Sequence, residues 1–158
     1  MTYHSVLLVE DEADDCELAQ LALHRSGISC RLDIVRDGVE LVDYLFHTGE
    51  YRTRESDEMP QLILLDLKLP RLNGLQILQM LRRIRWDDRE NLPPVVVLTS
   101  SDQEEDIVQA YHLGAHSYVR KPVDFAEFTR MMQTLLNYWL NVNIPPPQTR
   151  KLDGVIAH

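Results

Sequence analysis

The chain has 158 residues, which is the size of one domain. Its 16 Lys and Arg residues against 25 Asp and Glu residues give a net charge of −9, so the sequence offers no basic surface for nucleic acid or an anionic membrane. A hydrophobic content of 44% excludes wholesale disorder, no apolar run reaches the ~18 residues of a membrane span, and the two cysteines lack a Cys-x-x-Cys spacing, which together predict a cytoplasmic globular protein.

Three continuous apolar runs, one alternating segment of the edge-strand type and one short segment predict five strands, and an amphipathic segment that predicts a helix follows each of them. The strands are expected at 6–9, 30–35, 62–65, 95–98 and 117–119. The helices are expected to begin near residues 12, 37, 73, 104 and 124. Such alternation is typical of parallel β-α-β units with right-handed crossovers, and it predicts a doubly wound α/β fold.

Two segments fall outside this alternation. The connection 47–60 is longer than the about 4–6 residues usual between packed elements, and it is either a partner-contacting loop or a surface insertion. The C-terminal segment 141–158 is too short for a second domain. Its apolar residues and its run of prolines predict an arm that packs against its own domain or a second subunit; the alternative is a frayed helix end followed by disorder.

Polar residues stand where the apolar strand runs stop. Glu10 and Asp11 follow the first run, Asp66 follows the third, Thr99 follows the fourth, and Lys121 follows the short fifth strand. The carboxyl ends of parallel strands share one edge of an open sheet, which is where such folds place their sites. Residues more than a hundred positions apart are therefore expected to meet in one pocket.

The chemistry of this pocket favours phosphoryl transfer. Three carboxylates at close range repel one another, so either protons or a cation must lie among them. Oxygen-only ligation favours Mg²⁺ or Mn²⁺ over zinc. A carboxylate nucleophile at Asp66, a hydroxyl at Thr99 and an ammonium at Lys121 would then support formation of an aspartyl-phosphate. The nearby Asp14 and Asp15 are interpreted as a solvated helix end.

Four sequence motifs in this pocket resemble those of a known family. They are Val9-Glu10-Asp11, Leu65-Asp66-Leu67-Lys68-Leu69-Pro70 with Gly74, Leu98-Thr99-Ser100, and Tyr118-Val119-Arg120-Lys121-Pro122. In this order and spacing, the chain resembles the receiver domain of two-component response regulators over roughly residues 4–140. The resemblance implies a flavodoxin-like fold, with five helices around a five-stranded parallel sheet of strand order 2-1-3-4-5. Residues 1–140 would form the receiver domain and residues 141–158 a C-terminal extension.

The resemblance also implies a phosphoacceptor and a metal site. Asp66 would accept the phosphoryl group and bind Mg²⁺, with Glu10 and Asp11 as the acidic pair at the ion and Mn²⁺ as an alternative ion. The backbone carbonyl of Lys68 would be a further ligand. The family more commonly has an Asp-Asp pair, but the longer Glu10 side chain still reaches the ion. The side chain of Lys68 either reaches the phosphoryl oxygens or a neighbouring carboxylate and alters the lifetime of the phosphorylated state, or it extends into solvent.

A conformational switch is implied by the same resemblance. Thr99 would bind the phosphoryl group and move inward, and Tyr118 would be the aromatic residue that turns inward after it. Lys121 would bridge the phosphoryl group to the acidic cluster. Pro122 matches the position at which the family has a cis-proline, which would help to aim Lys121.

A narrower resemblance concerns the partner. The segments 47–60, 93–99 and 138–140, the last followed by prolines, resemble single-domain response regulators that work with phytochrome-type histidine kinases. A histidine kinase would dock on the first helix around residues 16–23. Output would pass through the surface of the fourth helix, fifth strand and fifth helix, roughly residues 104–140, by homodimer formation or by binding another protein.

Two other functions are weighed against this one. A phosphohydrolase of the haloacid-dehalogenase type uses similar residues, but it needs a second aspartate two residues after the nucleophile, where this chain has Lys68, and a cap domain for which the chain has no room. A pseudo-receiver of the same fold would bind partners without accepting phosphate, which the intact set of polar residues argues against. We expect a phosphoacceptor with intrinsic phosphotransfer and slow autodephosphorylation rather than an enzyme.

Overall fold

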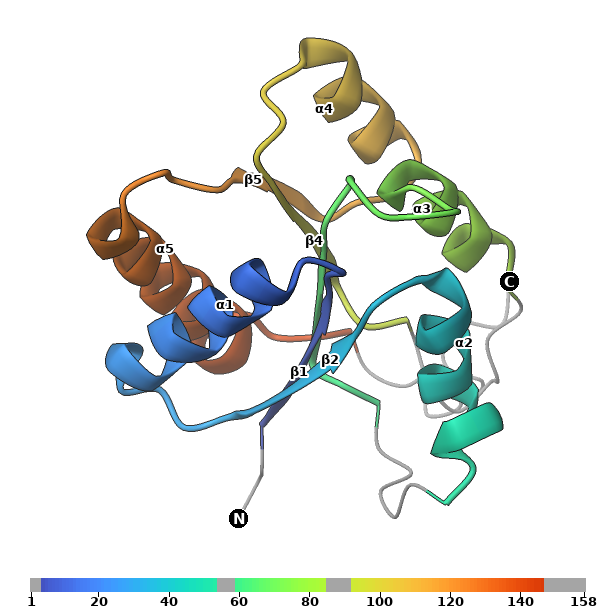
Figure 1. The fold of residues 1–158 in the computed structure, drawn as a ribbon, viewed down its shortest axis with the longest axis horizontal. Helices are drawn as coiled ribbons and strands as arrows, with labels where there is room; N and C mark the ends of the chain where they lie inside the picture. Colours follow the sequence, from blue (N-terminus) through green and yellow to red (C-terminus); the bar gives the residue numbers. More distant parts are fainter. Residues whose placement is uncertain (1–3, 54–58, 85–91, 147–158) are drawn as a thin grey trace.

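The structure is a computed structural model that describes residues 4–53, 59–84 and 92–146. Within these residues, five strands alternate with five α-helices (Figure 1). The strands are β1 (Ser5–Val9), β2 (Arg31–Val35), β3 (Leu62–Leu65), β4 (Val95–Thr99) and β5 (Ser117–Arg120). The helices are α1 (Ala13–Ser26), α2 (Gly38–Phe46), α3 (Gly74–Arg83), α4 (Glu104–His112) and α5 (Phe125–Asn137), with a 3₁₀ turn at Gly49–Tyr51 and a π-helical turn at Tyr138–Val142.

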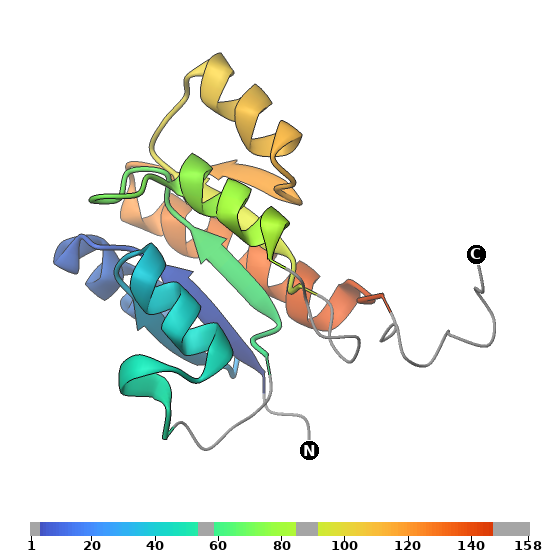
Figure 2. The ribbon, with the colours of Figure 1, turned by 90° about the vertical axis from the view of Figure 1, so that its right-hand side faces the viewer.

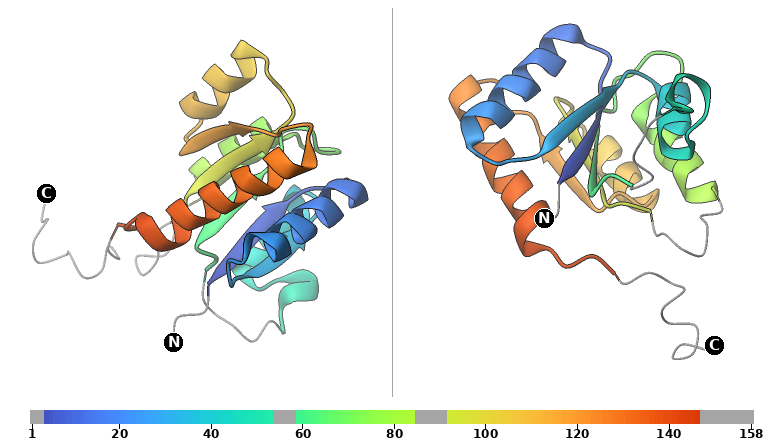
Figure 3. Two further views of the ribbon diagram at one scale, coloured as in Figure 1. Left: turned by 90° about the vertical axis from the view of Figure 1, so that its left-hand side faces the viewer. Right: turned by 90° about the horizontal axis from the view of Figure 1, so that it is seen from below.

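The five strands form one parallel sheet in the order β2-β1-β3-β4-β5. This confirms the fold class and the strand order expected from the sequence. Helices α1 and α5 cover one face, and α2, α3 and α4 lie over the other (Figures 2 and 3). Because helices cover both faces, every residue of β1, β3 and β4 is buried, which explains why these strands are continuous apolar runs.

The sheet ladder continues past the strand ends and fixes the residues that follow them. The backbone N–H of Glu10 donates to the carbonyl of Val35 at 2.9 Å, and that of Asp66 donates to the carbonyl of Val9 at 3.1 Å. Between β4 and the edge strand β5, the N–H of Lys121 donates to the carbonyl of Thr99 at 2.8 Å. The backbones of these residues are thus held by the sheet itself rather than by free loops.

The first half of the 47–60 connection packs against α2. The ring of Tyr51 meets that of Tyr44 edge-on, with the centroids 5.3 Å apart, and its hydroxyl donates to Glu40 Oε1 at 2.6 Å. Residues 54–58 lie outside the described part of the chain. Whether this connection contacts a partner stays a prediction.

The chain beyond α5 begins as part of the domain. Leu140 is buried and Trp139 packs against the core between the sheet and helices α1 and α5, whereas Val142 and Ile144 are exposed. Residues 147–158 lie outside the described part, so the alternatives of an arm and a disordered end stay open. Among the described residues, none of the helices has the length and apolar character needed to cross a bilayer.

Gly74 lets the start of α3 approach the end of β3. A Cβ at this position would lie 2.5 Å from the carbonyl oxygen of Asp66 and 2.6 Å from Cα of Leu67, both of which are backbone atoms that cannot turn away. We expect Gly74→Ala to lower the free energy of unfolding by about 1–3 kcal/mol, the usual cost of overpacking. Urea unfolding followed by circular dichroism measures this loss.

Gly38→Ala provides the control. Its added methyl group would meet only side-chain carbons, the nearest at 3.3 Å, which can shift by a few tenths of an ångström. Equal losses of stability in the Gly74 and Gly38 variants would contradict the close backbone approach at Gly74.

Candidate functional site

The side chains that follow β1, β3 and β5 meet at the carboxyl edge of the sheet. Nζ of Lys121 lies 2.6 Å from Oε1 of Glu10 and 3.4 Å from Oδ2 of Asp66. The exposed fractions of these side chains are only 15% for Lys121, 1% for Glu10 and 7% for Asp66. Residues up to 111 positions apart in the chain therefore form one largely buried ionic cluster.

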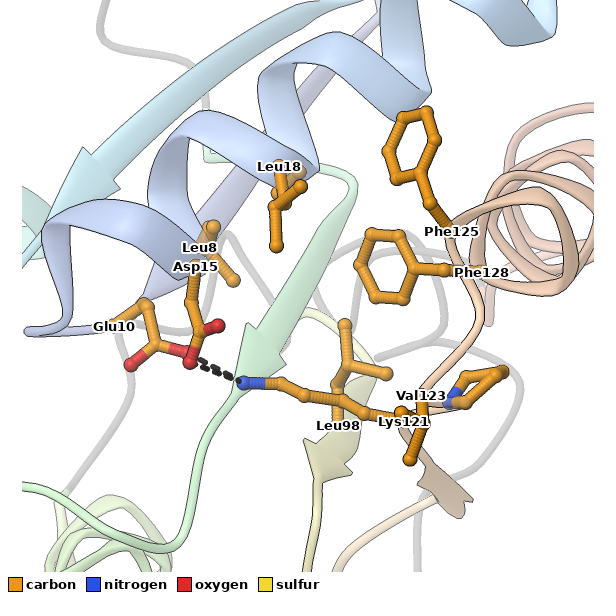
Figure 4. Close-up of a pocket in the computed structure, with 11 residues that line it drawn as sticks. Leu8, Glu10, Asp15, Leu18, Leu98, Lys121, Val123, Phe125 and Phe128 are labelled. Atoms are coloured by element: carbon orange, nitrogen blue, oxygen red, sulfur yellow. Dashed lines mark hydrogen bonds and ion pairs between the residues drawn. The ribbon is translucent and has the colours of Figure 1, made fainter.

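Asp15, in the first turn of α1, also belongs to this cluster. Its Oδ2 lies 3.4 Å from Nζ of Lys121, and Figure 4 shows the Lys121 side chain directed at the carboxylates of Glu10 and Asp15. The interpretation of Asp15 as part of a solvated helix end is therefore wrong. A helical residue faces the sheet edge only if the phase of its helix turns it inward, and that phase is hard to read at the first turn of a weakly amphipathic helix. The sequence signal that could have identified Asp15 as part of the site is its position shortly after the end of the first strand.

The oxygen atoms at this edge fit a hard divalent cation. One carboxylate oxygen from each of Glu10, Asp15 and Asp66 lies within 4.8 Å of the others. Asp11 is outside this group of three, yet its Oδ1 is buried without a hydrogen-bond partner in the described part of the chain. A buried oxygen of this kind is costly unless a ligand satisfies it. Oxygen donors alone are what Mg²⁺ and Mn²⁺ favour.

Burial and charge shift the ionisation of the central pair. Burial raises the pKa of Glu10 to about 7, although the hydrogen bond and charge of Lys121 oppose the shift. Burial alone would lower the pKa of Lys121, but the hydrogen bond to Glu10 and the charge of Asp66 outweigh it, so this pKa is raised. Among the described ion pairs of this cluster, one ammonium contacts three carboxylates, and such an excess of carboxylates favours binding of a cation.

The two residues predicted to switch are both linked to Ser101. Thr99 is fully buried, and its Oγ1 accepts a hydrogen bond from the backbone N–H of Ser101 at 3.4 Å. The hydroxyl of Tyr118 donates to the carbonyl of Ser101 at 2.9 Å. The hydroxyl of Ser101 in turn donates to Asp106 Oδ2 in α4 at 2.6 Å. Ser101 therefore connects Thr99 to both Tyr118 and α4 through hydrogen bonds.

The side chain of Lys68 is exposed, as one of the two alternatives expected. Its Nζ also donates to the hydroxyl of Ser100 at 3.3 Å, on the loop after β4. The backbone N–H of Lys68 donates to Oδ1 of Asp66 at 3.2 Å and so orients that carboxylate. The metal-binding role of its carbonyl and the effect of its side chain on phosphoryl lifetime stay predictions.

The peptide bond before Pro122 is trans, as are all others in the described ranges, so the expected cis-proline is wrong for this structure. An X–Pro bond prefers the trans form by about 0.5–1 kcal/mol unless its surroundings impose the other. Lys121 is aimed instead by its backbone hydrogen bond to Thr99 and by its short contact with Glu10.

A mostly apolar cleft opens beside the ionic cluster, between α1 and the start of α5 (Figure 4). Lys121, Glu10 and Asp15 line its polar end. Leu18 and Val123 lie at its exposed rim, where their side chains meet solvent. The acidic pocket is thus bordered by an accessible apolar surface.

Comparison with known proteins gives consistent matches. A family model described as the response regulator receiver domain matches residues 6–133. The response regulator Rcp1 of Synechocystis is 37% identical over 141 residues, covering 89% of this chain and 92% of Rcp1. A probable methanogenesis regulatory protein of Methanothrix harundinacea, FilR2, is 36% identical over 142 residues, covering 89% of this chain and 86% of FilR2.

Solved structures of two related regulators superpose well on this fold. The phosphorylated cyanobacterial phytochrome response regulator RcpA has a TM-score of 0.79 and 33% identity, covering 92% of this chain and 99% of the RcpA chain. The Mn²⁺-bound form of Rcp1 has a TM-score of 0.76 and 35% identity, covering 90% of this chain and 99% of the other.

The raised pKa of Glu10 predicts how stability depends on pH in the metal-free protein. The pKa is about 7 in the folded chain against 4.5 for an unperturbed glutamate, so the neutral form is favoured on folding. This contribution to stability is full below the unfolded-state pKa and is lost as the pH rises through the folded-state pKa. Relative to Glu10→Gln, the unchanged protein should therefore lose free energy of unfolding as the pH rises from 4.5 to 7.

Urea unfolding at a series of pH values, with a chelator present, measures this difference. Glu17→Gln, which removes an exposed carboxylate from α1, serves as the control and should follow the unchanged protein. A constant difference between Glu10→Gln and the unchanged protein over this range would contradict the raised pKa.

Proposed function

The chain belongs to the response regulator receiver domain family, and on this premise we propose that it is a single-domain response regulator whose Asp66 accepts a phosphoryl group from a histidine kinase. The observation that carries the proposal is the contact of one ammonium, on Lys121, with both Glu10 and Asp66 at the carboxyl edge of the sheet. Residues 1–140 would form the receiver and residues 141–158 its C-terminal extension. The match to Rcp1 covers 92% of that response regulator, which supports assigning this receiver to the same class.

The proposed transfer moves one phosphoryl group between two side chains. A carboxylate oxygen of Asp66 attacks the phosphorus of a phosphohistidine, so a P–O bond forms as the P–N bond breaks. The electron pair of the broken bond stays on the imidazole nitrogen, and the ring leaves as neutral histidine after taking one proton from water. Lys121 and the hydroxyl of Thr99 would stabilise the oxygens of the transferred group by charge and by hydrogen bonding.

Mg²⁺ is the proposed cofactor, with Mn²⁺ as an alternative, and the donor atoms support it. Glu10, Asp11, the side chain of Asp66 and the carbonyl of Lys68 would hold the ion. The buried, unpaired Oδ1 of Asp11 and the close carboxylates of Glu10 and Asp66 support this assignment. When bound, the cation would offset the negative charge of the phosphoryl oxygens during transfer.

The proposed switch connects the phosphorylated site to α4 and β5. Once the hydroxyl of Thr99 turns to the phosphoryl group, its contact with Ser101 is lost, and the bonds from Ser101 to Tyr118 and Asp106 carry the change to the surface. The α4–β5–α5 face carries exposed Tyr111, and among the residues of α4 only Ala110 is fully buried. Output would pass through this face, by homodimer formation or by binding another protein.

A histidine kinase of the phytochrome type is the proposed partner. The match to RcpA, a phytochrome response regulator, supports this class of kinase. Leu18 and Leu21 on α1 are exposed for about two-fifths of their surface, and Leu18 borders the cleft next to the acidic pocket. A partner helix that docks there would place its phosphohistidine close to Asp66.

Acetyl phosphate and intact mass spectrometry test the proposal. With Mg²⁺ present, we expect the chain to gain the mass of one phosphoryl group, because a small acyl phosphate can replace the kinase as donor. Asp66→Asn should abolish the gain, since an amide oxygen is a poor nucleophile, whereas Asp14→Asn, at an exposed position in the first turn of α1, should retain it.

Each other outcome points to a competing function. Continuous turnover of phosphorylated substrates without accumulation on Asp66 would indicate a phosphohydrolase. Neither uptake nor turnover would indicate a pseudo-receiver, and uptake that persists in Asp66→Asn would place the phosphoacceptor elsewhere.

A further inference from the structure

Lys121 has three carboxylate partners, and they are not equivalent. The contact with Glu10 is short, at 2.6 Å, while those with Asp15 and Asp66 are longer and equal, at 3.4 Å. Charge-assisted hydrogen bonds are normally about 2.7–2.9 Å long, so the two longer contacts are loose. The ammonium is therefore anchored on Glu10 and lies equally far from Asp15 and Asp66.

Resting on the proposed function, we propose that Asp15 is a positioning residue that holds the ammonium of Lys121 at the edge of the pocket when Glu10 and Asp66 are engaged by a divalent cation. A dication at these two carboxylates repels the ammonium and takes two of its three partners. Of the three described carboxylates that contact Nζ of Lys121, Asp15 is then the one still available. Without it, Lys121 would remain beside the cation unpaired, at a cost in cation affinity.

The location of Asp15 suits this role. Its side chain is 41% exposed, against 1% for Glu10 and 7% for Asp66, so its charge is only partly desolvated. It stands in the first turn of α1, where the helix dipole favours a carboxylate. Asp15 is therefore the most accessible of the three carboxylates that contact Nζ of Lys121.

The positioned ammonium remains ready for the transferred group. From Asp15, Lys121 has to move only a short way back to meet a phosphoryl oxygen on Asp66, because its backbone is fixed to Thr99 and only the side chain changes partner. Asp15 thus connects two states of Lys121, one beside the bound cation and one beside the phosphoryl group.

A comparison of Asp15→Asn with Asp14→Asn tests the role at constant net charge. Both residues lie in the first turn of α1, but the side chain of Asp14 is exposed and only that of Asp15 reaches Lys121. Calorimetric titration with Mg²⁺ should give an affinity about threefold lower for Asp15→Asn than for Asp14→Asn, within the range of a partly exposed ion pair. Equal affinities would overturn the proposal.

The same pair of substitutions in a Lys121→Met background shows whether Asp15 acts through the lysine. With the ammonium gone, the difference in Mg²⁺ affinity between Asp15→Asn and Asp14→Asn should become smaller, because only the charge of Asp15 near the site remains. A difference of the same size in both backgrounds would mean that Asp15 acts on the ion directly, and it would overturn the positioning role.

A measurement on the metal-free protein separates this proposal from the proposed function. The side-chain ammonium resonance of Lys121 should shift in Asp15→Asn and stay in place in Asp14→Asn; an unshifted resonance in both would overturn the contact. Failure of the unchanged chain to bind Mg²⁺ would count against the proposed function, and the ammonium resonance would still decide whether Asp15 holds Lys121.

Discussion

The ammonium of Lys121, buried among three carboxylates, is the interaction on which the rest of the site depends. Its shortest contact is with Glu10, and loss of the ammonium would leave this buried carboxylate without that charged partner. The excess of negative charge around them favours binding of a cation in the pocket. The ammonium of the same lysine can also pair with the oxygens of a phosphoryl group. One side chain therefore serves the resting pocket, the proposed metal-bound state and the proposed phosphorylated state.

The parallel topology lowers the entropic cost of bringing the charged residues of this cluster together. The backbones of Glu10, Asp66 and Lys121 are each hydrogen-bonded to a neighbouring strand, so the sheet orders them before their side chains interact. Little further entropy is lost when the charged groups meet. Gly74 adds a second constraint, because it lets the start of α3 lie against the backbone carbonyl of Asp66.

The sequence predicted the strands and the residues at their ends, because an apolar run that stops at a polar residue marks both the strand and the edge at once. The strand order also followed from the resemblance. Asp15 was missed because its orientation depends on the phase of α1, and the cis form of Pro122 was wrong because a family property was carried to a bond that local sequence does not determine. The course of Lys68 toward Ser100 depends on a loop contact between distant segments, which no local pattern encodes.

The pairing of the edge strand β5 carries a chemical consequence. Thr99 pairs with Arg120 in the last step of the β4–β5 ladder, and Lys121 comes directly after it. A slip of one residue in this short strand would bring either the guanidinium of Arg120 or the uncharged ring of Pro122 to the pocket, and every side chain of the strand would change faces. The register of the four β4–β5 residue pairs at the edge of the sheet thus determines which side chain meets the carboxylates. Engineering of this fold therefore has to preserve that register as carefully as the carboxylates themselves.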